Sequence, residues 1–400
     1  MRHACILLHR YLGLTMALFL VVAGLTGSIM AFEDEIDAWL NPQLFEVASH
    51  GMALSPARLA ARIEQQDSRL RVTYMPLGSA PGAATQVGVK ALVDPGTGRP
   101  HELGFNQLFA DPVSGAVLGV RQAGAMQLDR VHLIPLIVKL HYSLFLPGSW
   151  GLWLFGAVAL LWTVDCVIAL YLTFPRGRPF MRKWAPAWQI ASRRFNFDLH
   201  RAGGLWTWGM LLILAISSVS LNLYSEVFRP VVSWFSPLTP TPFDTRPAQA
   251  ELREPAFDYD RALSLAESAG VTRGIGRPAG AIGYRPERGF YFVTYRRTQG
   301  RTESGLSNVR LYFDDQTGKV IGERGTGTDS AGDFFAQLQY PLHSGRIAGV
   351  AGRAFICAMG MLVTAFSVTG IVIWWRKRRS RVFSSERRRT FVETSPHVRA

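Results

Sequence analysis

Cysteine and charged residues are scarce in this 400-residue chain, and each scarcity excludes a class of protein. The three cysteines all lie inside apolar segments, where they cannot build the disulfide framework of a small secreted domain. No Cys-x-x-Cys-His motif is present, which excludes covalent attachment of a c-type haem. Charged residues make up 18% of the chain, below the roughly 25% of a typical soluble domain. Together with a mean hydropathy of +0.12, this composition argues against an ordinary soluble enzyme.

Four apolar runs are long enough to cross a bilayer, which takes about 20 residues. They are the segments 11–32, 150–174, 205–224 and 347–375. The first could instead be a cleaved signal peptide, but its run exceeds the roughly 7–15 apolar residues of such a peptide, so we expect a membrane helix. The intervening segments, 33–140 and 226–342, are polar and rich in Gly, Pro and Asp, and each is long enough for a small folded domain.

The basic residues gather at one set of helix ends. Segments 1–10, 175–201 and 376–400 hold 18 Lys and Arg residues against three acidic ones, which accounts for the whole net charge of +14. The positive-inside rule then predicts that both termini and the middle loop are cytoplasmic and that the two large segments face the other side. Because topology explains the Arg-rich tail, we expect a lipid bilayer and no nucleic acid as its partner.

The two halves of the chain repeat one pattern. A His-Arg pair opens the first and third spans, and a Leu-His pair precedes the second and fourth. In each half this second histidine follows the Gly of an Asp-x-x-x-Gly turn, by 26 residues in the first half and 25 in the second. The four histidines are His9, His141, His200 and His343. Since both copies start inside, this is a parallel repeat about the membrane normal.

Each outer segment has an α/β pattern. In the first, Ser55 and Pro56 stand at the N-cap and first turn of an amphipathic helix, and alternating apolar residues then predict strands. The predicted elements are a helix over 55–66 and strands over 71–75 and 86–93 in the first segment, and a helix over 258–269 and strands over 289–296 and 308–313 in the second. The second segment therefore repeats the first.

A helix, then strands, then an Asp-x-x-Thr-Gly turn resembles the PepSY module; such turns begin at Asp94 and Asp314. With the four spans and the placed histidines, the whole chain resembles the PepSY-associated transmembrane family. The resemblance implies four transmembrane α-helices in two repeated units, with α+β PepSY-like periplasmic domains, in the bacterial inner membrane. That family includes proteins linked to iron uptake, among them di-haem ferric-siderophore reductases.

The repeat places one histidine pair in each leaflet. His9 and His200 begin helices that start at the cytoplasmic face, whereas His141 and His343 precede helices that start at the outer face. A b-type haem held by two histidines needs two neutral imidazoles, from separate helices, on opposite sides of the iron. We therefore expect two haem b groups, one near each face, with these four histidines as iron ligands. The alternative for each is an interfacial side chain, and His132 is the nearest substitute ligand at the outer face.

Cations near the histidines are candidate partners of haem propionates. Arg346 and Arg353 follow the fourth histidine, and Arg353 lies within a span, where we expect a buried partner. Arg10 and Arg201 adjoin the inner histidines, but the topology already explains them. Asp165, the other ionisable residue within a span, has three possible roles: it relays a proton, hydrogen-bonds a neighbouring helix or pairs with an arginine.

Small residues lie beside the histidines. They are Ser143, Gly203, Gly204, Ser344 and Gly345. Either they let a flat macrocycle approach the backbone or they serve close packing between helices, and the sequence favours neither.

These features predict an oxidoreductase, a di-haem b reductase that passes electrons across the inner membrane to a periplasmic ferric siderophore. The ferric chelate is implied by the resemblance alone, and no catalytic residue is singled out. No Gly-x-Gly-x-x-Gly follows a strand on the inner side, so the electron donor is separate, either a quinol or a flavoprotein. Two alternatives stay open, namely a non-redox PepSY sensor or scaffold that binds a peptide or protein, and a proton-coupled transporter.

Overall fold

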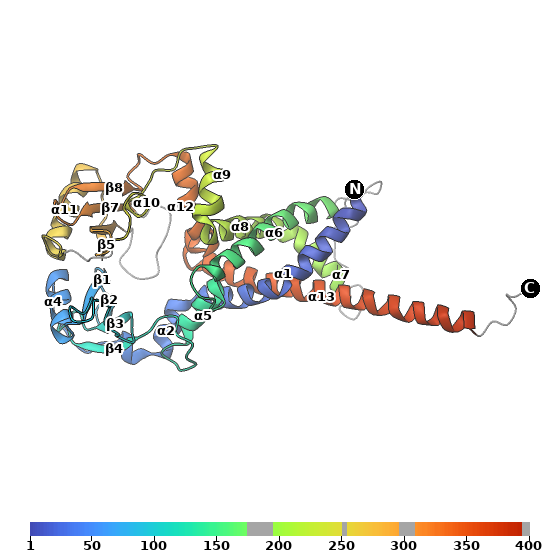
Figure 1. Cartoon of the computed structure of the whole chain (residues 1–400), viewed down its shortest axis with the longest axis horizontal. Helices are drawn as coiled ribbons and strands as arrows, with labels where there is room; N and C mark the ends of the chain where they lie inside the picture. The colour runs from blue at the N-terminus through green and yellow to red at the C-terminus, as the bar shows by residue number, and fades with distance from the viewer. Residues whose placement is uncertain (174–194, 250–253, 296–308, 394–400) are drawn as a thin grey trace, which may run out of the picture. The chain divides into compact units, whose positions relative to one another are not determined.

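The computed structural model describes residues 1–173, 195–249, 254–295 and 309–393, with side chains up to residue 380 (Figure 1). The chain divides into two compact units. We call them the helical unit and the sheet unit. The helical unit comprises 1–28, 141–223 and 356–400, and the sheet unit comprises 29–140 and 224–355. The basic cluster predicted within 175–194 falls outside the described residues.

Four helices are long and apolar enough to cross a membrane, which confirms the four predicted spans. Within the described residues they are Arg2–Met30, Trp150–Thr173, Phe195–Asn222 and Arg346–Ser380. The first is α1 (Arg2–Met30) and the second is α6 (Trp150–Thr173). The third joins α7 (Phe195–Asp198), the π-helical turn η2 (Leu199–Gly203) and α8 (Gly204–Asn222), and the fourth joins η4 (Arg346–Ala348) to α13 (Gly349–Glu393).

Small residues bring these helices together. A Cβ on Gly24 of α1 would collide with the backbone of Gly360 in α13, and the Ser28 hydroxyl donates to the Cys357 carbonyl at 2.9 Å. On the other side of the bundle, α6 packs along α8, where Gly156 leaves room for the Leu223 side chain. Close approach through small residues is the usual way in which helices associate in lipid.

The sheet unit contains one antiparallel sheet of eight strands in the order β4-β3-β2-β1-β5-β6-β7-β8. We call the two halves the first lobe and the second lobe. The first lobe holds β1 (Leu70–Pro76), β2 (Thr85–Ala91), β3 (Gln107–Ala110) and β4 (Val117–Arg121), and the second holds β5 (Ala279–Arg285), β6 (Phe290–Tyr295), β7 (Val309–Asp314) and β8 (Val320–Arg324). The lobes join where Tyr74, Met75 and Pro76 of β1 pair with β5. The two outer segments therefore share a sheet, although each is long enough to fold alone.

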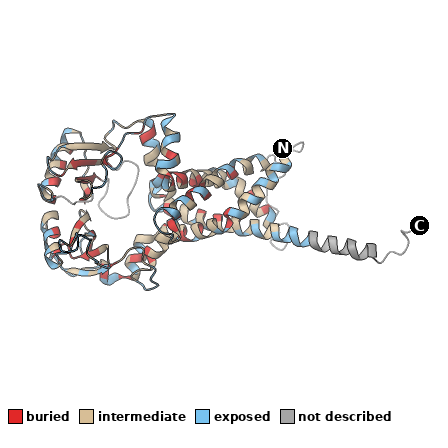
Figure 2. Ribbon diagram, viewed as in Figure 1, coloured by how far each residue is buried: buried red, intermediate tan, exposed pale blue. Residues whose placement is uncertain are grey.

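One face of the sheet is covered by the two predicted helices, α4 (Pro56–Gln66) and α11 (Tyr259–Thr272). Their apolar sides close the main core over the middle strands, where most buried residues of this unit lie (Figure 2). Hydrogen bonds tie the lobes together, because Asp260 of α11 accepts from the Ser55 hydroxyl at 2.6 Å and the Tyr259 hydroxyl donates to the Val72 carbonyl at 2.6 Å. Burial raises the pKa of Tyr259 well above its ordinary value.

Among the described residues, the short helices α3 (Pro42–Phe45) and α10 (Pro242–Thr245) cover the two ends of the opposite face. Gly119 of β4 lies against Leu44 of α3, and Gly322 of β8 lies against Pro242 of α10. A Cβ at either glycine would strike the helix above it, so both are required for this close approach. The matching glycines show that the sequence repeat is a structural repeat.

The remaining helices connect the sheet unit to the spans. They are α2 (Glu33–Leu40), α5 (Leu133–Ser143), η3 (Tyr224–Phe228), α9 (Arg229–Ser233) and α12 (Ala331–His343). The second histidine of each half lies at the end of α5 or α12, so a separate short helix precedes the span in both halves.

Candidate functional site

The two inner histidines meet within the helical unit. The ring centres of His9 on α1 and His200 in η2 are 6.2 Å apart, with an angle of 57° between the ring planes. Two imidazoles bonded to opposite sides of one iron, each at about 2 Å, have centres about 6 Å apart. The spacing of this pair therefore suits a shared metal ion.

Hydrogen bonds fix the outward nitrogen of each inner imidazole. The Nδ1 of His9 lies 2.8 Å from Oδ1 of Asp165 on α6, and the Nδ1 of His200 lies 3.0 Å from the Phe366 carbonyl of α13. A carbonyl and a carboxylate accept hydrogen bonds, so both Nδ1 atoms carry a hydrogen, and Nε2 is the nitrogen that a metal ion could bind. Ligating histidines are usually held by such partners. The bond to His9 is also one of the roles left open for Asp165.

A cavity of about 820 Å³ surrounds this pair, within the range of roughly 300–1,000 Å³ that cofactor pockets span. A Cβ at Gly13 or Gly204, which line the cavity, would meet no atom within 4 Å, so a flat group could lie against the backbone there. Gly203 differs, because a Cβ would come within 2.8 Å of the Phe366 ring. Gly204 therefore keeps space in the cavity, whereas Gly203 serves helix packing.

Five basic side chains line the cavity: Arg2, Arg10, Arg201, Lys377 and Arg378. They come from the N-terminal end of α1, from η2 and from the middle of α13. This charge suits the carboxylates of a haem, whose ring is apolar and whose propionates are anionic. Sequence reasoning weighed Arg10 and Arg201 as propionate partners and favoured topology; the structure places both on the cavity wall, and a role toward haem stays a prediction.

The outer histidine of the first half also lies in the helical unit. The Nδ1 of His141 is 2.9 Å from the Thr26 hydroxyl of α1, and that hydroxyl donates to the Val22 carbonyl at 2.6 Å. The hydroxyl therefore accepts from His141, which again places the hydrogen on Nδ1. A Cβ at Gly27 would come within 3.1 Å of the His141 ring, just as one at Gly370 would come within 3.3 Å of His200. Both imidazoles are thus set against a glycine of another helix.

The outer histidine of the second half, His343, is the last residue of α12 and belongs to the sheet unit. His141 and His343 therefore lie in different units, and their pairing around a second haem stays a prediction. His132, the substitute ligand, lies in the sheet unit, where its Nδ1 is 2.8 Å from Oδ2 of Asp129. It has the same carboxylate–imidazole arrangement as His9, so its Nδ1 is occupied in the same way.

The two predicted cations of the fourth span are bound by acidic residues of α2. Arg353 forms a two-pronged ion pair with Glu35 at 2.7 and 2.5 Å, and Arg346 lies 3.2 Å from Glu33 and 3.5 Å from Asp34. Arg353 is thus paired, but the buried partner expected for it is wrong: Arg353 itself is 4% exposed, whereas the side chain of Glu35 is 51% exposed. The Arg353 guanidinium lowers the pKa of Glu35. Three consecutive acids after the first span were the available signal, and sequence reasoning missed them. A role of Arg346 and Arg353 toward haem propionates stays a prediction.

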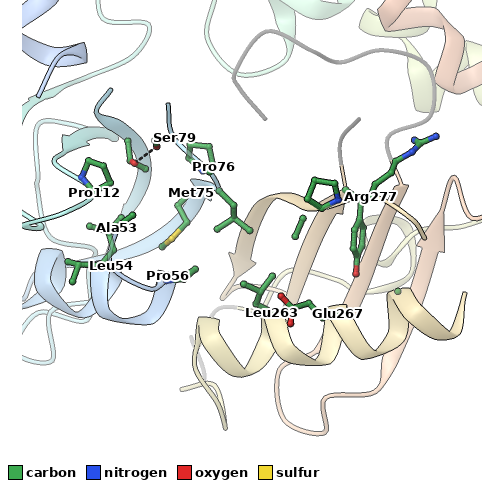
Figure 3. Close-up of a pocket in the computed structure, with 18 of the residues that line it drawn as sticks. Ala53, Leu54, Pro56, Met75, Pro76, Ser79, Pro112, Leu263, Glu267 and Arg277 are labelled. Atoms are coloured by element: carbon green, nitrogen blue, oxygen red, sulfur yellow. Dashed lines mark hydrogen bonds between the residues drawn. The ribbon is translucent and has the colours of Figure 1, made fainter. Parts of the chain in front are cut away.

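A second cavity, of about 490 Å³, lies between the two lobes of the sheet unit (Figure 3). Its edges are formed by prolines from both lobes, namely Pro56, Pro76, Pro112 and Pro278. The Ser79 hydroxyl is bonded to Thr85 at 2.7 Å, and the Tyr295 hydroxyl donates to the Ala266 carbonyl at 2.6 Å. Within the described residues no three His, Cys, Asp or Glu side chains gather as a metal site.

Comparison with known protein families gives one result that covers nearly the whole chain. The profile of the PepSY-associated TM region matches residues 6–377, so the chain belongs to this family of membrane proteins. A comparison with curated proteins returned no match.

Proposed function

We propose that this member of the PepSY-associated TM family is a haem b oxidoreductase that carries electrons across the inner membrane to a ferric siderophore. The observation that carries the proposal is the inner histidine pair, with ring centres 6.2 Å apart and both Nδ1 atoms engaged. Its position in a cavity with a basic rim supports a resident haem rather than a bare metal ion. A second haem between His141 and His343 completes the proposed path.

The residues around the inner pair have distinct tasks. Asp165 and the Phe366 carbonyl bind the Nδ1 atoms of the two imidazoles and so leave each Nε2 for the iron. Gly13 and Gly204 leave room for a flat ring. The arginines on the cavity wall neutralise propionates. When bound there, haem iron supplies a one-electron carrier whose potential depends on its axial ligands and their hydrogen bonds.

Electron balance sets the two partners. A quinol or a flavoprotein gives up the electron on the cytoplasmic side, because the chain carries no nucleotide-binding motif of its own. The acceptor is Fe³⁺ in a periplasmic siderophore, which becomes Fe²⁺ and is then held less tightly by hard oxygen ligands. This orientation follows from the basic cytoplasmic segments, and the siderophore follows from the family resemblance.

The test is a reduced-minus-oxidised absorbance spectrum of the purified protein with a measured haem-to-protein ratio. We expect b-type bands and two haems per chain, with one haem lost in His9→Ala or His200→Ala. His50→Ala, at an exposed loop position, is the matched control and should keep both. Reduction of several ferric chelates by the pre-reduced protein then tests the acceptor.

A colourless protein that retains all four histidines would overturn the proposal. The His9–Asp165 contact at 2.8 Å would then favour a proton-coupled transporter, because a carboxylate–imidazole couple within the spans can pass a proton. A protein with neither haem nor proton coupling would favour a non-redox sensor or scaffold.

A further inference from the structure

The face of the second lobe opposite α11 carries four arginines, which we call the arginine face: Arg285, Arg288, Arg310 and Arg324. All four are partly exposed. We propose that this face binds an anionic ligand rich in carboxylate or catecholate oxygens, and thus that the ferric chelate of the proposed function is a negatively charged one. The inference rests on that proposed function only for the identity of the ligand.

The arginines surround two aromatic rings. Arg285 of β5 and Arg310 of β7 lie over the Phe292 ring, with guanidinium carbons 5.0 and 5.3 Å from its centre. Arg288 lies 6.0 Å from the centre of Phe243 on α10. Each guanidinium is held at this place by hydrogen bonds to neutral groups, such as that from Arg310 to the Thr294 hydroxyl at 3.1 Å. Stacking on the phenylalanine rings fixes the guanidinium groups and leaves some of their N–H donors available for a ligand.

None of the four arginines has an ion pair in the part of the chain that the structure describes. The nearby carboxylates are bound to other cations, because Asp314 binds Arg246 at 2.7 Å and Glu287 binds Lys90 at 3.2 Å. Burial lowers the pKa of Arg285; the charge of Glu287 opposes this shift, and the neighbouring charge of Arg310 adds to it. A cation in such surroundings is stabilised by an arriving anion.

An unpartnered buried donor points in the same direction. The Nε of Arg324 is buried and has no hydrogen-bond partner among the described residues. Arg324 stands directly opposite Arg310 in the β7–β8 ladder, so two like charges share one cross-strand position. Like charges placed opposite each other are destabilising, and a buried donor without a partner costs more. An anion between the two arginines would relieve both costs.

In the first lobe, the arginine at the position that corresponds to Arg324 has partners from the chain itself. There Arg121 replaces Arg324, and its ladder partner is Gln107 in place of Arg310. Arg121 donates to Gln107 at 2.8 Å and pairs with Asp37 at 2.8 Å. With its partners supplied by the chain, Arg121 has no capacity left for a ligand. The second lobe has the same scaffold without those partners.

Ligand chemistry follows from the geometry. Guanidinium forks bind carboxylate or catecholate oxygens in two-pronged pairs, and planar rings stack on arginine and phenylalanine. Several forks on one face suit a ligand with several anionic oxygens. A neutral hydroxamate chelate would gain little from such a face.

The experiment measures binding of gallium(III) citrate to the purified full-length protein in detergent by calorimetry. Gallium(III) is not reduced, so binding is measured apart from electron transfer. We expect Arg310→Gln, which installs the residue of the first lobe, to weaken binding at least tenfold. Arg69→Gln, which removes an exposed arginine paired with Asp67 at 2.8 Å, is the matched control and should change nothing.

Thermal unfolding separates a binding role from a structural one. Because Arg310→Gln removes a like-charge contact with Arg324, we expect an unchanged or higher melting temperature beside the lost binding. If Arg310→Gln does not fold, Arg285→Gln on the other side of Phe292 takes its place. Equal binding by wild type and variant, or equal weakening by Arg69→Gln, would overturn the site.

Two further arms identify the ligand class. If inorganic phosphate at the same concentration displaces gallium citrate equally well, the face serves small anions and the chelate assignment is wrong. A neutral gallium trihydroxamate that binds as tightly as the citrate complex would also contradict it. A colourless protein that binds gallium citrate refutes only the haem proposal, and a haem protein that does not bind it refutes only this inference.

Discussion

Corresponding positions in the two halves of this chain differ in whether a carboxylate binds the cation or imidazole that stands there. In the first lobe Arg121 is bound by Asp37, whereas Arg324 at the corresponding position of the second lobe has an unpartnered Nε. Among the helices His9 is held by Asp165, whereas His200 is held by a neutral carbonyl. The fold has thus been duplicated with its backbone geometry intact, while the charges that complete each site have diverged. At both positions the first half provides a carboxylate, and in the second half the described residues provide none.

Removal of Asp37 should give the largest effect on this comparison. Asp37 and Arg121 are both 3% exposed, so Asp37→Ala leaves a buried guanidinium without its counter-charge. We expect a loss of about 3–5 kcal/mol in the free energy of unfolding, the usual result of breaking a buried pair. Denaturant titration of the purified protein in detergent measures it.

Arg324→Gln in the second lobe is the matched variant for that experiment and should be neutral or stabilising. The double variant Asp37→Ala/Arg121→Met should recover most of the lost stability, because it removes the stranded charge. A single Asp37→Ala variant as stable as wild type would show that the lobes do not differ in this way.

The two inner histidines should respond differently to loss of their anchors. Asp165→Asn replaces a charged acceptor by a neutral one while keeping the shape of the side chain. Changes in such supporting partners commonly weaken metal binding by about 10–100-fold, so we expect haem affinity to fall within that range. Haem titration of the apoprotein, followed by absorbance, measures the affinity.

Ser218→Ala on α8 is the control for that variant, since Ser218 does not line the cavity around the histidine pair. The Ser218 hydroxyl donates to the Leu214 carbonyl of its own helix at 2.7 Å, so its loss should leave haem affinity unchanged. Equal haem affinity in Asp165→Asn and wild type would remove Asp165 from the site.

The turns that begin at Asp111 and Asp314 should give the smallest difference between the lobes, in how stability depends on pH. Burial opposes the charged form of Asp314, but its bonds to Arg246 and to the Thr317 N–H outweigh this and lower the pKa to about 2. A carboxyl with a lowered pKa contributes stability that is present above its unfolded pKa and is lost as pH falls through the folded value. Asp314→Asn should therefore lower stability near neutral pH and remove part of the loss between about pH 4 and 2.

The side chain of Asp314 is partly exposed, so solvent screening keeps the expected effect below about 1 kcal/mol. Melting temperatures measured against pH test it. Asp111→Asn is the counterpart in the first lobe. Burial opposes the charged form of Asp111, but hydrogen bonds from serine hydroxyls and backbone N–H groups lower its pKa, and no arginine pairs with it among the described residues. If the melting temperature falls with decreasing pH in Asp314→Asn just as it does in the wild type, the loss of stability in acid does not come from the Asp314–Arg246 ion pair.

Much of the fold could be predicted because its signals are local. The four spans follow from hydropathy, and the α4 and α11 helices follow from a polar N-cap and an amphipathic period. Strands β3, β4, β5 and β8 were not predicted. The first, second and fourth of these are four to five residues long, and β5 has seven residues but includes two glycines, so all four carry little pattern. The joining of β1 to β5 was also beyond prediction, because only three residue pairs far apart in the chain form it.

The sequence by itself determined how many times the chain crosses a membrane, that its halves repeat, and where four histidines recur. Each of these depends on residues that are close together or evenly spaced. Only the tertiary structure decided which groups these residues meet: Asp165 for His9, Glu35 for Arg353, Asp37 for Arg121 and no described acid for Arg324. The reason is physical, since hydropathy and period act along the chain, whereas an ion pair depends on which distant segments the packing brings together.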